Sequence, residues 1–276
     1  DDGYESQTLA AKGGLNLPAN IRLDTSLLWS DAESEYDSYA FGAQGSVADG
    51  DEVSNSETLS GNISLKIPLL EGRLENLVQI GYADIERENV SNGVQSYFTE
   101  GDRVLYRYQG TLAINDANTL AFGAEHEETS ANEQDSSIDS LFALYEFKPV
   151  EDLTLTGGLR VDDHETFGSE TTGRVAAAWT ATEHVTFKAS WGQGFKAPSI
   201  FQSTYICSFC GLTEPNANLE PETSEAFDIG VQWQSSDQRL TLGATVFDQE
   251  TENLIDFSYT AGYDNIALVD SQGIEL

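Results

Sequence analysis

Two cysteines and three histidines are the residues of this chain with the most obvious capacity for chemistry. Cys207 and Cys210 form a C-x-x-C pair, a spacing shared by zinc sites, dithiol redox sites and short disulfides. Zinc would need two further soft ligands, and His126, His164 and His184 offer no matching spacing. A redox dithiol would need a helix start in a β-α-β context, which the surrounding sequence lacks. We favour a disulfide in a loop that faces an oxidising compartment.

Four acids spaced two residues apart form a candidate calcium site. They are Asp31, Glu33, Glu35 and Asp37. Carboxylate oxygens are the ligands that Ca²⁺ prefers, but the glycine-turn order of an EF-hand loop is missing. A solvated acidic loop is therefore the competing interpretation. No other metal or cofactor is predicted.

Paired carboxylates raise the question of acid–base catalysis. Asp162 and Asp163 are adjacent, and Glu220 and Glu222 lie two apart. A glycosidase needs two carboxyl groups facing one bond, whereas neighbouring residues of a strand point to opposite faces. No Ser-His-Asp elbow is evident either. We predict that the chain is not an enzyme.

Charge and hydropathy narrow the partners further. The chain has 276 residues, with 47 acidic and 13 basic side chains and a net charge of −34. Nucleic acid is excluded as a partner, because phosphate binding needs a basic face. Hydrophobic residues make up 39%, and no apolar run is long enough for a transmembrane helix. A transmembrane β-barrel keeps its mean hydropathy equally low, because only every second residue faces lipid.

The elements that position these residues follow a period of two. In residues 153–161, Leu153, Leu155 and Leu159 alternate with Thr154, Thr156 and Arg160, which is typical of half-buried strands. We count roughly 14 such segments of about 10 residues, the length of a membrane-spanning strand. Short turns lie near 18–20, 70–72, 116–118, 149–152, 182–184 and 235–237, and long polar loops are predicted at 31–56, 87–102, 129–137, 164–171 and 196–223. Strict alternation of short turns and long loops is typical of an antiparallel, up-and-down outer-membrane barrel.

The two faces of the strands differ in chemistry. The polar face carries basic residues that we predict to face the lumen: Arg103, Arg107, Arg160, Arg174 and Lys188. The apolar face carries aromatic residues, several of them near strand ends: Tyr145, Phe147, Trp179, Phe187, Trp191, Phe227 and Trp233. Such a girdle is typical of membrane–water interfaces, although the same residues would also suit an ordinary core.

The segments 192–201 and 218–231 carry a family resemblance. They read GQGFKAPSIF and NLEPETSEAFDIGV, and the block resembles the barrel of TonB-dependent outer-membrane receptors. The segment 157–168, GGLRVDDHETFG, is similar to a segment of the cobalamin-type receptors, and Asn253-Leu254-Ile255, Tyr263-Asp264-Asn265 and Gly273-Ile274-Glu275 continue the match. The first half of the chain matches only in its barrel pattern.

The resemblance implies a barrel of roughly 22 strands closed by a plug. It implies a receptor in the outer membrane of a Gram-negative bacterium that imports cobalamin or a ferric siderophore. Its partners would be membrane lipid, lipopolysaccharide and the TonB energy-coupling complex, which acts through the plug. A passive porin-like channel or an adhesin-like surface barrel is the alternative. We expect residues 1–276 to form a partial barrel domain, because we recognise no leader, TonB box, plug or terminal aromatic strand.

The resemblance also places the ligand on extracellular loops. Flat aromatic side chains suit a corrin or a catecholate chelate. The candidate contacts are Tyr36, Tyr39, Phe41, Tyr97, Phe98, Phe201, Tyr205 and Phe209. Each of these side chains could equally pack only its own loop.

Overall fold

The computed structural model describes residues 3–39, 47–207, 211–266 and 268–276. The chain divides into two compact units. Unit 1 comprises Asp1–Pro68, Asn76–Tyr108 and His126–Ser137, and unit 2 comprises Leu69–Glu75, Gln109–Glu125 and Ile138–Leu276. The contacts discussed below lie within one unit or the other.

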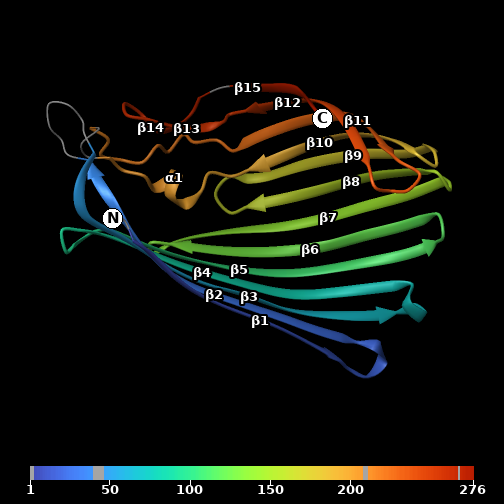
Figure 1. Ribbon diagram of the computed structural model, residues 1–276, viewed down its shortest axis with the longest axis horizontal. Helices are drawn as coiled ribbons and strands as arrows, with labels where there is room; N and C mark the ends of the chain where they lie inside the picture. Colours follow the sequence, from blue (N-terminus) through green and yellow to red (C-terminus); the bar gives the residue numbers. More distant parts are fainter. Residues whose placement is uncertain (1–2, 40–46, 208–210, 267) are drawn as a thin grey trace. The chain divides into compact units, whose positions relative to one another are not determined.

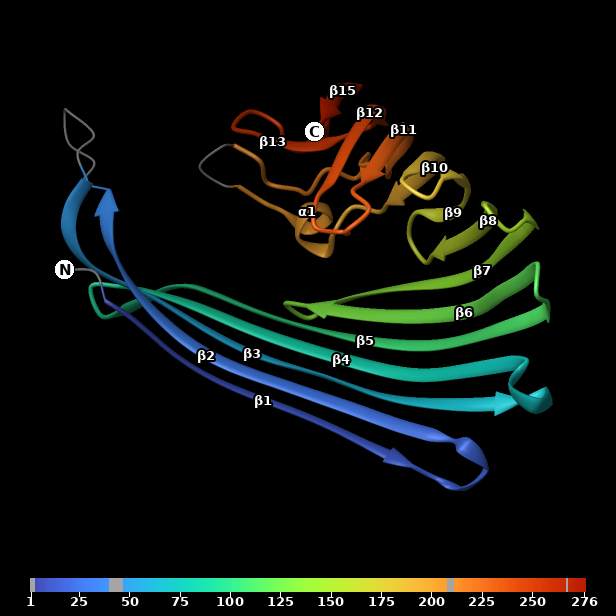
Figure 2. The same ribbon diagram turned by 45° about the vertical axis from the view of Figure 1, so that its right-hand side comes forward.

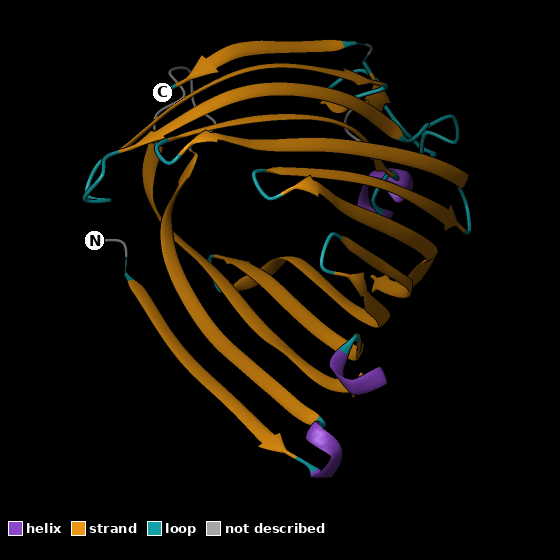
Figure 3. Cartoon of the chain, turned by 90° about the vertical axis from the view of Figure 1, so that its right-hand side faces the viewer, coloured by secondary structure: helices purple, strands orange, loops and turns teal. Residues whose placement is uncertain are grey.

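Antiparallel strands dominate the described residues, as Figures 1 and 3 show. They are β1 (Tyr4–Asn16), β2 (Arg22–Tyr39), β3 (Val47–Leu69), β4 (Leu74–Ser91), β5 (Val94–Asn115), β6 (Asn118–Ala131), β7 (Gln134–Val150), β8 (Leu153–His164), β9 (Gly168–Thr182), β10 (Val185–Lys196), β11 (Glu222–Gln234), β12 (Thr241–Glu252), β13 (Ile255–Ser258), β14 (Gly262–Asn265) and β15 (Val269–Glu275). Strands β1 to β12 follow one another in sequence order in a 13-stranded sheet that ends with β15. Strands β13 and β14 form a separate hairpin. The order is linear from β1 to β15, so the sheet is an up-and-down sheet that is not closed into a barrel.

The short turns lie where the sequence predicts them. Two are single 3₁₀ turns, η1 (Pro18–Asn20) and η2 (Leu70–Gly72), and the others join β5 to β6, β7 to β8, β9 to β10 and β11 to β12. In the last of these turns the Ser235 hydroxyl donates to Asp237 at 2.7 Å and the Arg239 backbone N–H donates at 3.2 Å. These two hydrogen bonds lower the pKa of the Asp237 carboxyl, because they favour its charged form.

The opposite connections differ from the predicted loops in their boundaries. Segments 87–102 and 129–137 are mostly strand, closed by the two-residue turns Asn92-Gly93 and Asn132-Glu133. All four turn residues have positive φ, as a type I′ hairpin turn requires. In segment 31–56, β2 likewise pairs with β3, and their last pair is Tyr39 with Val47. Polarity on both faces of these extensions suggested loops, but strands that project into water can be polar on both faces.

The connection from β10 to β11 keeps an irregular course in its described residues. It contains a short helix, α1 (Ile200–Thr204), which the sequence analysis did not predict. The Ser199 side chain accepts a hydrogen bond from the Gln202 backbone N–H, and the Gln202 side chain accepts one from the Ser199 N–H. This reciprocal capping box fixes the start of the helix.

Side-chain burial in this sheet is the reverse of that in a water-soluble protein. Among the described residues, the buried hydrophobic ones are only Cys207, Leu219 and Ile255, whereas Asn76, Ser140, Asp162, His164 and Glu222 are buried polar or charged residues. Large apolar side chains are exposed along the strands, and Leu159 is 65% exposed. An apolar surface of this extent needs an apolar environment. No helix in the described part of the chain is long and apolar enough to cross a membrane.

Candidate functional site

The apolar face of unit 2 carries the predicted aromatic girdle. Trp179 on β9 and Phe187 on β10 are cross-strand partners, and their rings stack with centroids 5.8 Å apart. Both side chains are exposed, as are those of Phe227 and Trp233 on β11. These rings are therefore exposed and do not form a core in the described residues, and a girdle at a membrane–water interface stays a prediction.

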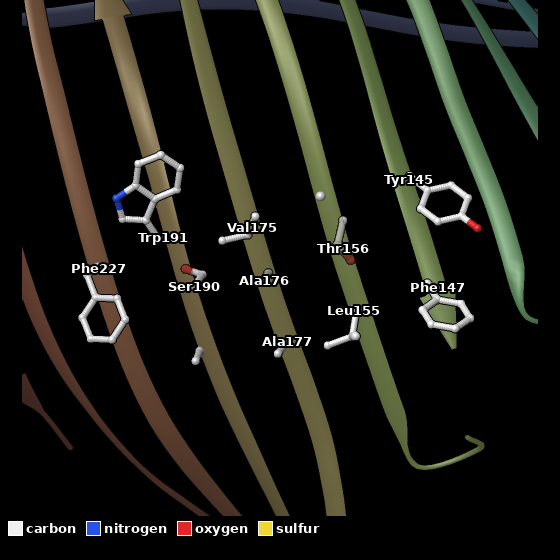
Figure 4. Close-up of a pocket in the computed structure, with 12 residues that line it drawn as sticks. Tyr145, Phe147, Leu155, Thr156, Val175, Ala176, Ala177, Ser190, Trp191 and Phe227 are labelled. Atoms are coloured by element: carbon white, nitrogen blue, oxygen red, sulfur yellow. The ribbon is translucent and has the colours of Figure 1, made fainter. Parts of the chain in front are cut away.

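A shallow groove of about 510 Å³ lies on this apolar face. Figure 4 shows Tyr145 and Phe147 of β7 on one side and Trp191 and Phe227 on the other. Small residues of the intervening strands line it between these walls, among them Gly157, Ala177 and Ala189. Its lining is almost entirely apolar, so the groove offers shape and van der Waals contact and no charged group.

The polar face of unit 2 holds a charge network around Arg160. Its guanidinium donates to Glu125 Oε2 at 2.7 Å, to Asp162 Oδ1 at 2.8 Å and to Ser140 Oγ at 2.8 Å. The Ser140 hydroxyl donates to Asp162 Oδ1 at 2.6 Å, and the Asp162 side chain is only 8% exposed. Two carboxylates thus share one cation, which is how buried charge is tolerated. Sequence analysis identified Arg160 but not this network. Asp162 lies two residues further along β8, whereas Ser140 lies on β7 and Glu125 on β6, and no local pattern contains the pairing of these strands.

The other predicted basic residues occupy similar positions. By strand register, Arg174 lies opposite Gly158 and Gly192, and therefore shares the face of Arg160. Lys188 belongs to that face too, and its Nζ donates to Gln232 at 3.1 Å. In unit 1, Arg103 and Arg107 share one face of β5, and Arg103 pairs with Glu127. That these faces line a lumen stays a prediction.

Two connections of unit 2 fold together into what we call the loop module. It comprises the described residues of 197–221, which join β10 to β11, and residues 253–265, which contain the β13–β14 hairpin (Figures 1 and 2). The Asn265 side chain donates to Glu220 O at 2.9 Å and to Asn253 O at 2.6 Å, and accepts from Glu220 N–H at 2.9 Å. Asn216 donates to Tyr263 O at 3.1 Å. These bonds join segments about 45 residues apart in sequence.

The loop module also contains the only buried hydrophobic residues in the described parts of the chain. Cys207, Leu219 and Ile255 are 2%, 6% and 8% exposed. Glu222 lies at the base of the module, where it pairs with Lys196 at 2.9 Å and accepts the Ile255 N–H at 3.1 Å. The module therefore has a small hydrophobic core of its own, as a globular unit in water does.

Five aromatic rings gather on the loop module. Tyr205 has edge contacts at 5.5 Å to Phe201, at 5.5 Å to Phe257 and at 5.3 Å to Tyr263. Tyr259 continues the cluster through Phe257, at 5.5 Å and 79°. Phe201 and Tyr205 were predicted as ligand contacts, whereas Phe257, Tyr259 and Tyr263 were missed. The pairing of Phe257 with Tyr263 across a hairpin that turns at Gly262, with φ 71°, was the available signal.

The other predicted contacts that the structure describes belong to unit 1. Tyr36 is on β2, and Tyr97 and Phe98 are on β5, so they belong to strands and not to irregular loops. Tyr39 ends β2. Phe41, Phe209 and Cys210 lie outside the described residues. Cys207 is disulfide-bonded, and its pairing with Cys210 stays a prediction.

The four acids of the calcium prediction lie on strand β2. Asp31, Glu33, Glu35 and Asp37 occupy alternate positions there, and Glu35 accepts the Gly3 backbone N–H at 3.0 Å. Within the described ranges, no three His, Cys, Asp or Glu side chains are grouped so that they could hold a metal ion. Calcium binding by these four acids stays a prediction.

Comparison with known proteins agrees with this architecture. The family model for the TonB dependent receptor-like β-barrel matches residues 1–276. A vitamin B12 transporter, BtuB, of Photobacterium profundum is 25% identical over 293 aligned residues, which cover 100% of this chain and 45% of that protein. BtuB of Vibrio cholerae is 31% identical over 167 residues, covering 55% of this chain and 25% of its own length. The chain thus spans less than half the length of these curated relatives.

Solved structures resemble the fold over nearly the whole chain. The siderophore receptor PirA of Pseudomonas aeruginosa superimposes with a TM-score of 0.79 at 17% identity, over 99% of this chain and 53% of that one. The hemophore receptor HasR of Serratia marcescens superimposes with a TM-score of 0.75 at 18% identity, over 98% of this chain and 51% of that one. The relatives named here are receptors and transporters. Together with the inside-out sheet and the match over its full length, these comparisons establish that this chain belongs to the TonB-dependent receptor β-barrel family.

Proposed function

We propose that this chain is the barrel portion of an outer-membrane receptor in a Gram-negative bacterium. The receptor would import a large, scarce nutrient, cobalamin or a ferric siderophore, by energy-coupled gating. The observation that carries the proposal is the reversed burial of the sheet, with exposed apolar side chains on one face and paired charges on the other. A surface of this kind suits lipid on the outside and a polar passage on the inside.

The partners follow from the family and from the two faces. Membrane lipid and lipopolysaccharide would contact the aromatic girdle and the apolar groove. The TonB complex would act through a plug domain. The polar face, with Arg103, Arg107, Arg160, Arg174 and Lys188, would line the passage in which the plug sits. Arg103 and Arg160, which are paired with carboxylates, and Lys188, which donates to Gln232, would give that passage fixed hydrogen-bonding groups.

The chemistry of this function is binding and release, without bond cleavage. Ligand would first meet the loop module, whose aromatic rings and hydrogen-bonded connections form a preorganised surface. Movement of the plug would then open the passage. The passive-channel and adhesin alternatives account for the strands but not for the family match over the whole chain.

Uptake by living cells tests this proposal. The gene would be expressed at its full natural length in a Gram-negative host that lacks its own vitamin B12 and enterobactin receptors. We expect uptake of at least one of these two nutrients, and we expect deletion of the host TonB to reduce it to the level of receptor-free cells. Uptake that persists without TonB would instead indicate a passive channel.

A further inference from the structure

The open side of the aromatic cluster suggests a contact surface. Phe201 is 47% exposed and Tyr259 is 77% exposed, although both rings pack against other members of the cluster. Exposing apolar rings to water costs free energy, and exposed apolar patches of this kind are typical of surfaces that bind another molecule. Their edge-to-face packing holds them in fixed orientations.

The loop module is built to keep those rings in place. Asn265 and Asn216 connect its two segments, and Leu219 and Ile255 form its core with Cys207. A Cβ atom at Gly262 would lie 2.9 Å from Leu212 Cδ1, so the hairpin packs closely against the other connection. A surface held in this way loses little entropy when a ligand binds.

The charges around the cluster are all of one sign. The sequence contains no Lys, Arg or His between Lys196 and Arg239, and none after Arg239. Lys196 itself is paired with Glu222 at the base of the module. The module's acids are Glu214, Glu220, Asp256 and Asp264, and the last two lie directly opposite each other across the β13–β14 hairpin. Within the module, an anion that approaches these rings meets negative charges and no positive side chain.

We infer that the loop module selects ligands that carry no net negative charge and offer a broad flat face. This inference rests on the proposed receptor function and narrows it. Phe201 and Tyr259 would stack against the flat face, and the surrounding carboxylates would exclude multiply anionic metal chelates. Of the two nutrient classes proposed above, this favours an uncharged corrin over a tris-catecholate iron complex.

Binding to the purified full-length receptor tests the inference with two probes, vitamin B12 and ferric enterobactin. We expect vitamin B12 to bind at least about tenfold more tightly than the anionic chelate. Phe201→Ala and Tyr259→Ala should each weaken vitamin B12 binding about tenfold. Tyr4→Ala is the matched control, because Tyr4 is an exposed aromatic residue on β1, outside the module. It should leave the affinity unchanged.

Charge reversal provides a second variant that does not touch the rings. Glu214 and Glu220 have exposed side chains, so the double change Glu214→Lys with Glu220→Lys should leave the module folded. It should raise the affinity for ferric enterobactin about tenfold while vitamin B12 binding changes less than about twofold.

Three results would overturn the inference. Ferric enterobactin could bind the unaltered receptor as tightly as vitamin B12, vitamin B12 could fail to bind, or the ring and charge variants could leave both affinities unchanged. The receptor function would still stand in each case if the cellular assay showed TonB-dependent uptake of either nutrient. Loss of TonB-dependent uptake for both nutrients would count against the receptor function itself.

Discussion

At the scale of single residues, Arg160 explains how the polar face carries charge. Two carboxylates and a hydroxyl surround its guanidinium at 2.7–2.8 Å, so the charges compensate each other in a partly dehydrated position. Ion pairs of this kind matter chiefly because removing one member leaves the others uncompensated. Arg239 contrasts with it, since its 3.8 Å pair with Asp237 is highly exposed and should contribute little.

Replacing Arg160 tests this difference. Arg160→Ala should lower the free energy of unfolding by about 1–3 kcal/mol, because Glu125 and Asp162 would face each other without a cation. Arg239→Ala should change it by less than about 0.5 kcal/mol. Urea titrations of the receptor in lipid vesicles would measure both. Adding Asp162→Asn to Arg160→Ala should recover part of the loss, and a double variant less stable than Arg160→Ala would contradict the charge argument.

At the scale of elements, the loop module is held by a few polar side chains that bridge distant segments. Asn265 makes three hydrogen bonds to the backbones of Asn253 and Glu220. Removal of these three hydrogen bonds should free the β13–β14 hairpin from the β10–β11 connection. The sheet should not open, because β10, β11 and β12 keep the backbone hydrogen bonds that pair them. Local opening of this kind is a separate process from global unfolding.

Asn265→Ala should therefore increase amide hydrogen exchange in residues 200–222 by about 30-fold or more, as the loss of two or three hydrogen bonds predicts. Exchange in β8 and β9 should stay unchanged. Asn218→Ala is the matched control, because this residue lies on the same connection with an exposed side chain. Equal exchange in the two variants would show that Asn265 does not hold the module together.

At the scale of the whole molecule, local sequence patterns predicted the sheet but not the loop module. Alternation placed Leu159 and Arg160 on opposite faces, and the short turns at 70–72 and 235–237 lie as expected. The hairpin extension at Asn92-Gly93 was missed although the dipeptide is a strong turn signal, because its polar flanks indicated a loop. The aromatic cluster depends on contacts between α1 and the β13–β14 hairpin, about 50–60 residues apart, which no local pattern contains.

The same alternation predicts which face of each strand meets lipid, and the last prediction tests this assignment. Leu159 lies near the middle of β8 and is 65% exposed. In a water-soluble sheet, Leu159→Arg would change stability by less than about 0.5 kcal/mol. On a lipid-facing strand the same change should cost about 2–4 kcal/mol, because a charge in the middle of the hydrocarbon is poorly solvated. Folding into lipid vesicles, followed by urea titration, measures the difference.

The control for this prediction lies on the other face of the same strand. By register, Thr156 is opposite Glu146 on β7, so an arginine introduced there would meet a carboxylate and not lipid. Thr156→Arg should therefore be tolerated to within about 1 kcal/mol. If Leu159→Arg were equally well tolerated, the exposed apolar face would not be in a membrane, and the girdle of Trp179, Phe187 and Phe227 would need another partner. A loss confined to Leu159→Arg would show that the two faces of one strand lie in different solvents, which is what a receptor barrel requires.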